Sequence, residues 1–341
     1  MEAYILTPGS VPLSRDIADY PEGIIIPIDK PYRWTSADVI RKVKFAAIRH
    51  FGKKNLKVGH AGTLDPLATG VLLVCIGKAT KLAEELQKHD KEYVAGITFG
   101  ATTPSYDLEK EIDRFFPHEH ITASAVQEAL PAFIGEQDQI APLFSAKSVD
   151  GVRAYELARM LFKAGGGSLA DAVSSGDPHS SSGSLTDEMA KELIRVSRIN
   201  IMELEMLKFE PGVSGHVGLK NNPSHSFVVA ARCKSPLGSL LIAHDPCGQG
   251  GSTVFTTTTS EATVTKASSR INVTDNSALG LPRAEIRMAC SKGTYVRAFA
   301  RDLGEALGSG AHLDSLQRSR SGIFEVGKAL TVDQAIQILQ A

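Results

Sequence analysis

The stretch from Lys57 to Leu73, KVGHAGTLDPLATGVLL, constrains the fold of this chain more than any other. Its glycines and Pro66 impose turns on a short polar loop, and the run Val71–Ile76 behind the loop is apolar at every position. Such a run predicts a strand that is buried on both faces. The one carboxylate of the loop, Asp65, is therefore expected on a rigid support, which is where a catalytic group would sit.

Asp65 also has a purely structural interpretation. An aspartate followed by a proline is typical of a turn, or of a helix N-cap with proline at the first helical position. Residue types alone favour this interpretation, so a catalytic role for Asp65 depends on further signals in the chain.

Composition indicates a globular protein that is large enough for a sizeable core. The chain has 341 residues, of which 43% are hydrophobic and 22% are charged, and this length allows one large domain or two small ones. The formal net charge of −1 argues against a strongly basic nucleic-acid coat. Any RNA affinity must come from local patches, such as the cluster of Arg49, Lys53, Lys54 and Lys57, although such a cluster is ordinarily only a solvated face.

The cysteines and the N-terminus give no sign of an oxidising compartment or a membrane. Cys75, Cys233, Cys247 and Cys290 form no CxxC pair and lie in dissimilar contexts, so we expect reduced thiols and neither a disulfide framework nor a metal cluster. The first residues, MEAYILTPGSVPL, contain neither a basic region nor a long apolar stretch. We expect a soluble cytoplasmic protein that does not contact membranes.

Hydrophobic periodicity predicts helices and strands mixed along the chain, which favours an α+β fold over a repeated βαβ pattern. The expected strands are Val71–Ile76, Tyr93–Phe99 and Ala284–Cys290, and the expected helices are one from Ser36, Lys78–Lys88, Thr122–Phe133, Val152–Phe162 and one from Val296 to Leu307. Two stretches lack such patterns. Residues at about 165–190 are rich in Gly, Ser and Asp, and residues at about 211–282 are irregular apart from an expected strand at Phe227–Cys233, so we interpret both as insertions.

The residues from Gly59 to Leu72 match the pattern Gly-His-x-Gly-x-Leu-Asp-Pro-x-Ala-x-Gly-x-Leu, and in this the chain resembles the TruB family of tRNA pseudouridine synthases. The pattern is long and specific. Further blocks resemble the family in order along the chain: Gly23–Val43, Lys91–Asp107, Gln139–Arg159 and Cys290–Phe324. The resemblance covers roughly two thirds of the chain, and the remainder lies mostly in the two insertions.

The resemblance implies a single pseudouridine synthase catalytic domain over residues 1–341, without the C-terminal PUA domain that many relatives carry. It implies a central mixed or antiparallel sheet flanked by helices, with an RNA-clasping insertion. The implied activity is the isomerisation of uridine to pseudouridine in the T-loop of tRNA, at position 55. A monomer would perform it without a metal, a cofactor or a protein partner.

This isomerisation breaks the C1′–N1 glycosidic bond, turns the uracil over and joins C1′ to C5, without redox chemistry. A carboxylate suits it, either as a nucleophile toward the electron-poor sugar carbon or as a base at the sugar. The motif match implies that Asp65 is this carboxylate. An acylal at C1′, a Michaelis adduct and a glycal all stay open as intermediates.

In a site sealed from water Asp65 needs a cationic partner, and arginine offers a planar fork that is always protonated. The resemblance selects Arg297, which lies in the Gly-Thr-Tyr-Val-Arg segment at the start of an expected helix. The structural alternative is a surface arginine that pairs with Asp302 or Glu305.

A target base inside a folded loop must be flipped out, and a flipped base needs an aromatic platform. The resemblance implies that Tyr93 stacks on the uracil and takes part in catalysis, and that Tyr295 and Leu316 complete the pocket wall. It places His60 where it fills the stack left by the flipped nucleotides. Lys30 either contacts a phosphate or closes the Asp-Lys-Pro turn. Tyr93, His60 and Leu316 also have ordinary alternatives as core or capping residues.

One block departs from the family. Where the family commonly reads Pro-Pro-x-Tyr-Ser-Ala-x-Lys, this chain has Ala141 for the first proline, Phe144 for the tyrosine, and Lys147 one position early. The departure affects the expected clasp contacts to RNA and leaves Asp65 untouched.

Three other functions are compatible with parts of the sequence. Guide-RNA-dependent modification of ribosomal RNA would call for a PUA domain and protein partners. A tRNA-folding chaperone or RNA-binding protein would keep the basic patch and the aromatic residues without needing Asp65. A carboxylate glycosidase would normally need a second catalytic carboxylate.

Overall fold

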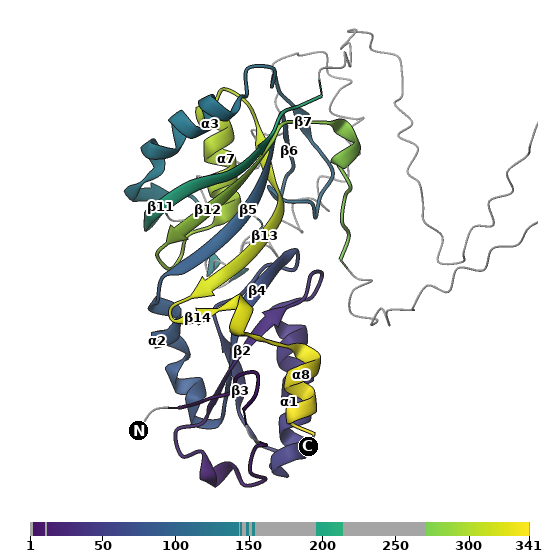
Figure 1. Ribbon diagram of the computed structural model, residues 1–341, viewed down its shortest axis with the longest axis vertical. Helices are drawn as coiled ribbons and strands as arrows, with labels where there is room; N and C mark the ends of the chain where they lie inside the picture. Colours follow the sequence, from purple (N-terminus) through teal and green to yellow (C-terminus); the bar gives the residue numbers. More distant parts are fainter. Residues whose placement is uncertain are drawn as a thin grey trace, which may run out of the picture. The chain divides into compact units, whose positions relative to one another are not determined.

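The computed structural model describes residues 3–10, 12–142, 144, 148–149, 152–153, 196–213 and 271–340, which belong to one compact unit (Figure 1). The expected insertion at about 165–190, the expected strand Phe227–Cys233 and all but the first two residues of the expected helix Val152–Phe162 lie outside the described residues. Within the described part, no helix is long and apolar enough to cross a membrane.

A long mixed sheet forms the centre of this unit, so the expected α+β class is confirmed. Its strands run in the order β1-β2-β4-β13-β5-β12-β11-β8. The pairs β1–β2 and β4–β13 are parallel, and the other pairs along this path are antiparallel. Their bounds are β1 Tyr4–Ile5, β2 Ile24–Lys30, β4 Ala68–Ile76, β13 Ala311–Ser321, β5 Lys91–Phe99, β12 Arg283–Cys290, β11 Ser197–Glu210 and β8 Gly135–Gln139.

Shorter strands, five α-helices and five 3₁₀ helices make up the other elements of the described residues. The strands β3 Val58–Ala61, β14 Phe324–Glu325 and β15 Leu330–Thr331 join the main sheet, and two small ladders pair β6 Ala101–Thr102 with β7 Arg114–Phe115 and β9 Ser148–Val149 with β10 Val152–Arg153. The α-helices are α1 Ser36–Phe51, α2 Ala83–Lys88, α3 Ala123–Ala129, α7 Val296–Ala306 and α8 Val332–Ile338. The 3₁₀ helices are η1 Ile17–Asp19, η2 Gly77–Leu82, η3 Leu130–Phe133, η5 Ser277–Leu279 and η6 Val326–Lys328.

The strand register places two helical layers on the same face of the sheet. Leu316 of β13 lies opposite Ala68 of β4 on one side and opposite Ala95 of β5 on the other. Directly opposed residues point to the same face of a sheet. Ala68 packs in the core under α1 and α8, whereas Ala95 packs in the core under α7 and α3. Leu316 therefore lies between the two layers, at the point where a cleft can form.

The predicted helix from Ser36 and the predicted strands at Val71–Ile76, Tyr93–Phe99 and Ala284–Cys290 are confirmed. The helix α1 begins with a capping box, in which Thr35 and Asp38 each accept a hydrogen bond from the backbone N–H of the other. It ends at Gly52, whose φ of 59° lies in the left-handed region that glycine favours. The strand β4 is buried on both faces, as its unbroken apolar run predicts.

Three predicted helices differ from the structure in part. The segment predicted at Lys78–Lys88 starts as the 3₁₀ helix η2 before α2, and the one predicted at Thr122–Phe133 ends as η3, where Pro131 cannot donate a helical hydrogen bond. The helix predicted from Val152 is wrong at its start, because Val152–Arg153 is a strand. Val152 pairs with Val149 across a two-residue connection, and the sequence there is Asp-Gly, the dipeptide typical of tight hairpins.

Candidate active site

The loop that carries Asp65 is held by hydrogen bonds from both sides. The hydroxyl of Ser36, the first residue of α1, accepts from the N–H of Leu64 at 3.0 Å and donates to its carbonyl at 3.2 Å. On the other side, the carbonyl of Pro66 accepts from the N–H of Arg33 at 3.0 Å. Asp65 is therefore fixed through its two chain neighbours, and its carboxylate is free to face a cleft.

Arg297 lies in the first turn of α7 and is almost completely buried, with 5% of its surface exposed. Its Nε donates to Oδ2 of Asp65 at 2.9 Å. Its Nη1 and Nη2 donate to the carbonyls of Ser105 and Phe144 at 3.0 and 2.9 Å. The guanidinium is thus anchored by backbone on one edge and presents the other edge to Asp65.

The alternative of a surface role for Arg297 is wrong. The neighbouring Arg301, one helical turn later, forms the ion pair with Asp302 at 2.7 Å. Arg297 points instead from α7 toward the Asp65 loop, which lies 232 residues earlier in the chain. The two residues come together because α7 packs on the face of the sheet toward which Ala68, at the start of β4, also points.

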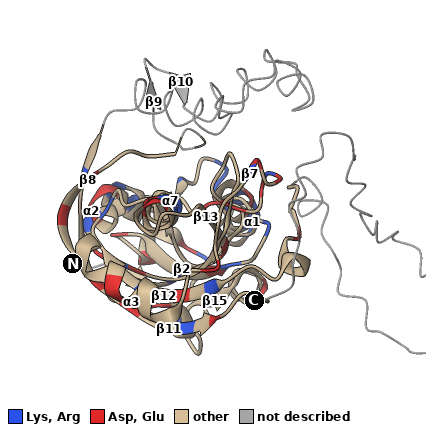
Figure 2. Ribbon diagram, turned by 90° about the horizontal axis from the view of Figure 1, so that it is seen from above, with Lys and Arg blue, Asp and Glu red and all other residues tan. Residues whose placement is uncertain are grey.

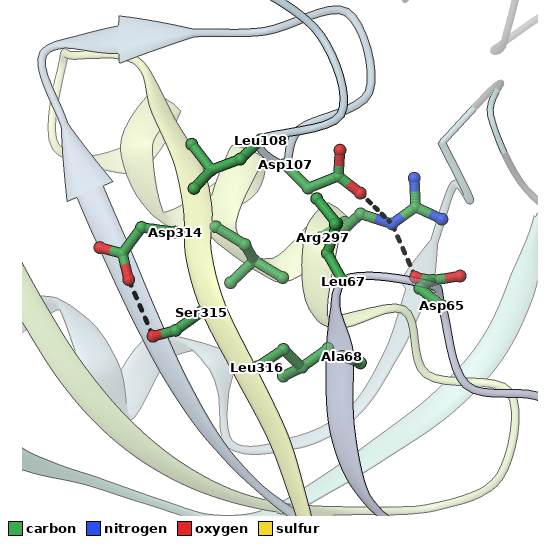
Figure 3. A pocket seen from close by; sticks show the side chains of 10 residues that line it. Asp65, Leu67, Ala68, Asp107, Leu108, Arg297, Asp314, Ser315 and Leu316 are labelled. Atoms are coloured by element: carbon green, nitrogen blue, oxygen red, sulfur yellow. Dashed lines mark hydrogen bonds and ion pairs between the residues drawn. The ribbon is translucent and has the colours of Figure 1, made fainter. Parts of the chain in front are cut away.

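A second carboxylate, that of Asp107, lies on the opposite side of Arg297. Figure 3 shows Nε of Arg297 between the two acids. The distance from Nε to Asp107 Oδ2 is 3.7 Å. The other oxygen, Oδ1, accepts from the hydroxyl of Ser105 at 2.6 Å and from the N–H of Glu109 at 2.9 Å. Asp107 is 7% exposed and is fixed at both oxygens, so it is suited to orient Arg297 and not to attack a substrate.

A cleft of about 570 Å³ opens beside Asp65. Five of the seven predicted site residues line it: Asp65, Arg297, Tyr93, Tyr295 and Leu316. They come from the β3–β4 loop, the start of α7, β5 and β13, so the cleft lies at the junction between the two helical layers. Its volume is in the range typical of sites for small organic groups.

Tyr93 and the buried Arg318 form a second polar contact in the cleft. Both lie on strands at the centre of the sheet, opposite one another in the register of β5 and β13. Burial raises the pKa of Tyr93, and a hydrogen bond from Arg318 partly opposes that shift. Arg318 is 2% exposed, and its Nε donates to the carbonyl of Val71 at 2.7 Å. Tyr93 is therefore a neutral, oriented phenol at the wall of the cleft.

Tyr295 is positioned through its main chain. The side-chain amide of Gln139 accepts from its N–H at 2.8 Å and donates to its carbonyl at 3.2 Å. This pairing satisfies backbone groups at the start of α7, where Tyr295 has no side-chain cap of its own. The backbone of Tyr295 is therefore held on both sides at the point where α7 begins.

Lys30 and His60 do not line this cleft among the residues that the structure describes. Lys30 has no exposed surface, and its Nζ donates to the carbonyls of Pro31, Trp34 and Pro66 at 3.0, 2.6 and 3.2 Å. This geometry favours the turn-closing role of Lys30 over a phosphate contact. Burial lowers the pKa of Lys30 to about 7, against the opposing attraction of Asp65.

His60 lies in the short strand β3 and is half-buried. Burial lowers its pKa, and the positive charge of Arg318 lowers it further. The imidazole is therefore neutral near pH 7, as a residue that stacks with bases would be. Its role in filling the stack left by flipped nucleotides stays a prediction.

Among the described residues, no group of three or more His, Cys, Asp or Glu side chains is placed to hold a metal ion. Asp65 is accessible at the cleft, because its side chain is 39% exposed while its Oδ2 is paired with Arg297. An accessible carboxylate beside a buried arginine is suited to nucleophilic or basic attack on an electron-poor carbon.

Comparisons with known proteins show the family to which this chain belongs. Residues 49–163 match the family described as TruB family pseudouridylate synthase (N terminal domain). A protein of Phocaeicola vulgatus with the name tRNA pseudouridine synthase B is 38% identical over 315 residues, which cover 92% of this chain and 92% of that protein. Proteins of the same name from Bacteroides fragilis and Flavobacterium johnsoniae are 37% and 34% identical, over 92% and 94% of this chain and 92% and 98% of their own. The chain therefore belongs to the TruB family of pseudouridylate synthases.

Proposed function

We propose that this protein isomerises uridine to pseudouridine in the T-loop of tRNA, at position 55, with Asp65 as the group that acts at the sugar. The observation that carries the proposal is the ion pair of Asp65 with the buried Arg297 on the wall of a cleft of about 570 Å³. Relatives that match over nearly the whole chain have the name tRNA pseudouridine synthase B, which supports tRNA as the RNA substrate.

Asp65 would attack with the oxygen that Arg297 leaves free. Arg297 binds Oδ2, and no described residue forms a hydrogen bond with Oδ1. Because the guanidinium is held by two backbone carbonyls, it keeps the carboxylate oriented while charge moves between Asp65 and the sugar. Asp65 acts as a nucleophile at C1′ or as a base at the sugar, and either role uses the same oxygen.

The target base would have to leave its stack in the RNA before it enters the cleft. A uridine within a folded loop must be extruded before a side chain can reach C1′, and its ring then needs an apolar face to rest on. Tyr93 and Leu316 offer such faces on adjacent strands, and Tyr295 closes the side nearest α7. Held in this way, the detached uracil can turn over without leaving the protein.

We also propose that one chain is sufficient in the cytoplasm, without a protein partner. Asp65, Arg297 and the aromatic residues of the cleft all come from a single polypeptide. An activity assay with the purified chain at a concentration where it is monomeric, as measured by light scattering, checks this. Activity that rises with the square of protein concentration would contradict it.

The test is an incubation of the purified protein with an unmodified tRNA transcript, followed by carbodiimide primer extension to map pseudouridine. We expect one new stop at the T-loop uridine. Asp65→Asn is the control, because it keeps the shape of the side chain, removes its charge, and leaves the two backbone bonds of Arg297 in place. The stop should vanish in this variant while tRNA binding persists.

Other outcomes would select among the rival functions. An active Asp65→Asn protein would refute the proposed role of the carboxylate. Binding of tRNA without modification by the unaltered protein would favour the RNA chaperone. Modification of a ribosomal RNA fragment only when a guide RNA is added would favour guide-dependent activity.

A further inference from the structure

The outer face of α1 carries cations that no carboxylate of the described residues neutralises. Lys42 and Arg49 are exposed, with Phe45 between them at helical positions i, i+3 and i+7, so the three side chains form one stripe along the helix. Lys44 lies exposed beside them. Within the described residues, none of these cations has a carboxylate at ion-pair distance. We call Lys42, Phe45 and Arg49 the α1 stripe.

Several other surface cations are paired with carboxylates. On the same helix, Arg41 is paired with Asp38 at 2.8 Å. Lys208 pairs with Glu210 at 2.6 Å, and Lys328 pairs with Glu325 at 2.9 Å. In a protein with a formal net charge of −1, the α1 stripe is thus a local excess of positive charge and not part of a generally basic surface.

The middle of the stripe is an exposed aromatic ring. Phe45 is 64% exposed, and the guanidinium carbon of Arg49 lies 5.7 Å from its ring centroid. Most of the ring is thus not buried by the rest of this protein. The cation–π contact, and not a carboxylate of the described residues, positions the guanidinium of Arg49. Cations interleaved with an exposed aromatic residue fit a polyanion with flat apolar groups, which is the chemistry of RNA.

The stripe runs away from the catalytic loop on the face of the sheet that carries the cleft. The first residue of α1, Ser36, is the one that binds Leu64 beside Asp65. At 1.5 Å per residue, Lys42 lies about 9 Å and Arg49 about 20 Å along the helix from Ser36. The core under α1 and the core under α7 share one face of the sheet, so RNA that enters the cleft can extend over α1.

We propose that the α1 stripe binds the phosphate backbone of the RNA stem that supports the target loop. The inference rests on the proposed function for the identity of the RNA. Its physical content is separate: Lys42 and Arg49 add affinity that depends on stem length and on salt, and they do not act at the reacting atoms.

The test compares Lys42→Gln/Arg49→Gln with the matched control Lys208→Gln/Lys328→Gln, which removes the same charge from ion-paired surface positions. Filter binding gives Kd for a full tRNA transcript and for a hairpin cut down to the loop and its closing base pairs. For the stripe variant we expect Kd for tRNA to rise about tenfold or more, and the slope of log Kd against log salt to fall by about 1.5 to 2. The short hairpin should show neither change.

A single-turnover assay at saturating enzyme separates binding from chemistry. In the stripe variant we expect Kd and KM to rise. The rate constant for modification of bound RNA should change by less than about twofold. Phe45→Ser should weaken tRNA binding to a smaller degree without altering the salt slope, because it removes stacking and no charge. Melting temperatures of all variants report whether they fold.

The outcomes for the stripe and for the proposed function are distinct. If the stripe variant and the control variant have equal tRNA affinity and equal salt slope, the inference is overturned, even if the protein modifies tRNA normally. The α1 stripe would then be a binding site for an acidic protein. An inactive unaltered protein that binds tRNA with the stripe-dependent salt slope would support the inference and refute the proposed function.

Discussion

Two arginines ten residues apart carry ion pairs on opposite faces of the same sheet, and the difference between them shows what burial does to a charge. Arg287 of β12 donates to Glu203 and Glu205 at 2.7 Å each, and to Glu92 at 3.3 Å. Arg297 of α7 pairs with one carboxylate at 2.9 Å and a second at 3.7 Å. Counted by contacts, Arg287 is the better-connected residue.

Exposure reverses that ranking. The Arg287 side chain is 28% exposed and its partners Glu203 and Glu205 are more than half exposed, so water and salt screen the attraction. Acidic and basic residues occur close together along β11 and β12 (Figure 2). The Arg297 side chain is 6% exposed, so water screens its attraction to Asp107 very little and each charge stabilises the other in the buried site. The number of ion pairs is thus a poor guide to importance, and burial is a better one.

The largest expected effect follows from removing the buried cation. Arg297→Met leaves Asp107 buried without its cation and two carbonyls without a donor. We expect the free energy of unfolding to fall by about 3 to 5 kcal/mol and the single-turnover rate to fall by at least about 100-fold. Urea unfolding and a tritium-release assay measure the two. Arg297→Lys should restore part of the stability and little of the rate, because a lysine cannot reproduce the fork.

Asp107→Asn should have the next largest effect. The substitution keeps the shape that accepts from Ser105 and Glu109, and it removes the charge beside Arg297. We expect the single-turnover rate to fall about tenfold with little change in tRNA affinity, because Arg297 is less firmly oriented. Asp113→Asn, which is in the same loop and bonds Thr102 instead, is the control. Equal rates for the two variants would contradict an orienting role for Asp107.

The sequence predicts much of the framework that holds this site. The apolar run of β4, the buried apolar face of α1 and the alternation of β12 each follow from local periodicity, and the structure confirms them. The ion pair of Asp65 with Arg297 could be expected only from the family resemblance, because 232 residues separate them in the sequence. No local pattern states which distant elements will share a face of a sheet.

Asp107 and Arg318 were not predicted as parts of the site. Asp107 closes the family block that begins at Lys91, but nothing in its neighbours indicates that its loop returns to Arg297. Arg318 could have been found from the alternation of β13, since it lies two residues after Leu316 and so shares its face. An arginine at an inward strand position is a signal of a buried polar contact, and here its partners are Val71 and Tyr93.

Lys30 extends the comparison to a buried cation whose hydrogen bonds, within the described part of the chain, are to carbonyls. Its pKa is lowered from 10.5 to about 7 by burial, so between these values the unfolded chain holds a proton that the folded chain has released. Raising the pH through this window therefore stabilises the folded state of the unaltered protein. Below pH 7 both states hold the proton, and the cost of burying the ammonium is present in full.

Lys30→Met tests this directly. The variant should be less stable throughout, because the carbonyls of Pro31, Trp34 and Pro66 lose their donor. Its deficit should grow by about 3 to 4 kcal/mol from pH 7 to pH 10, since only the unaltered protein gains stability in that range. Chemical denaturation at several pH values measures the difference. Lys328→Met, at an exposed position, should show no such growth, and a constant deficit for Lys30→Met would contradict the argument.

The smallest effect is expected for the arginine with the most ion pairs. Arg287→Gln removes contacts to Glu203, Glu205 and Glu92, yet all four side chains keep access to water. We expect the free energy of unfolding to fall by less than about 1 kcal/mol, and by still less in high salt, where the repulsion among the remaining carboxylates is screened. The rate of modification should not change, because Arg287 points away from the face that carries the cleft. Urea unfolding at low and high salt provides the measurement. A loss of several kcal/mol, close to that of Arg297→Met, would mean that the outer network acts as a unit, and that connectivity can compensate for exposure.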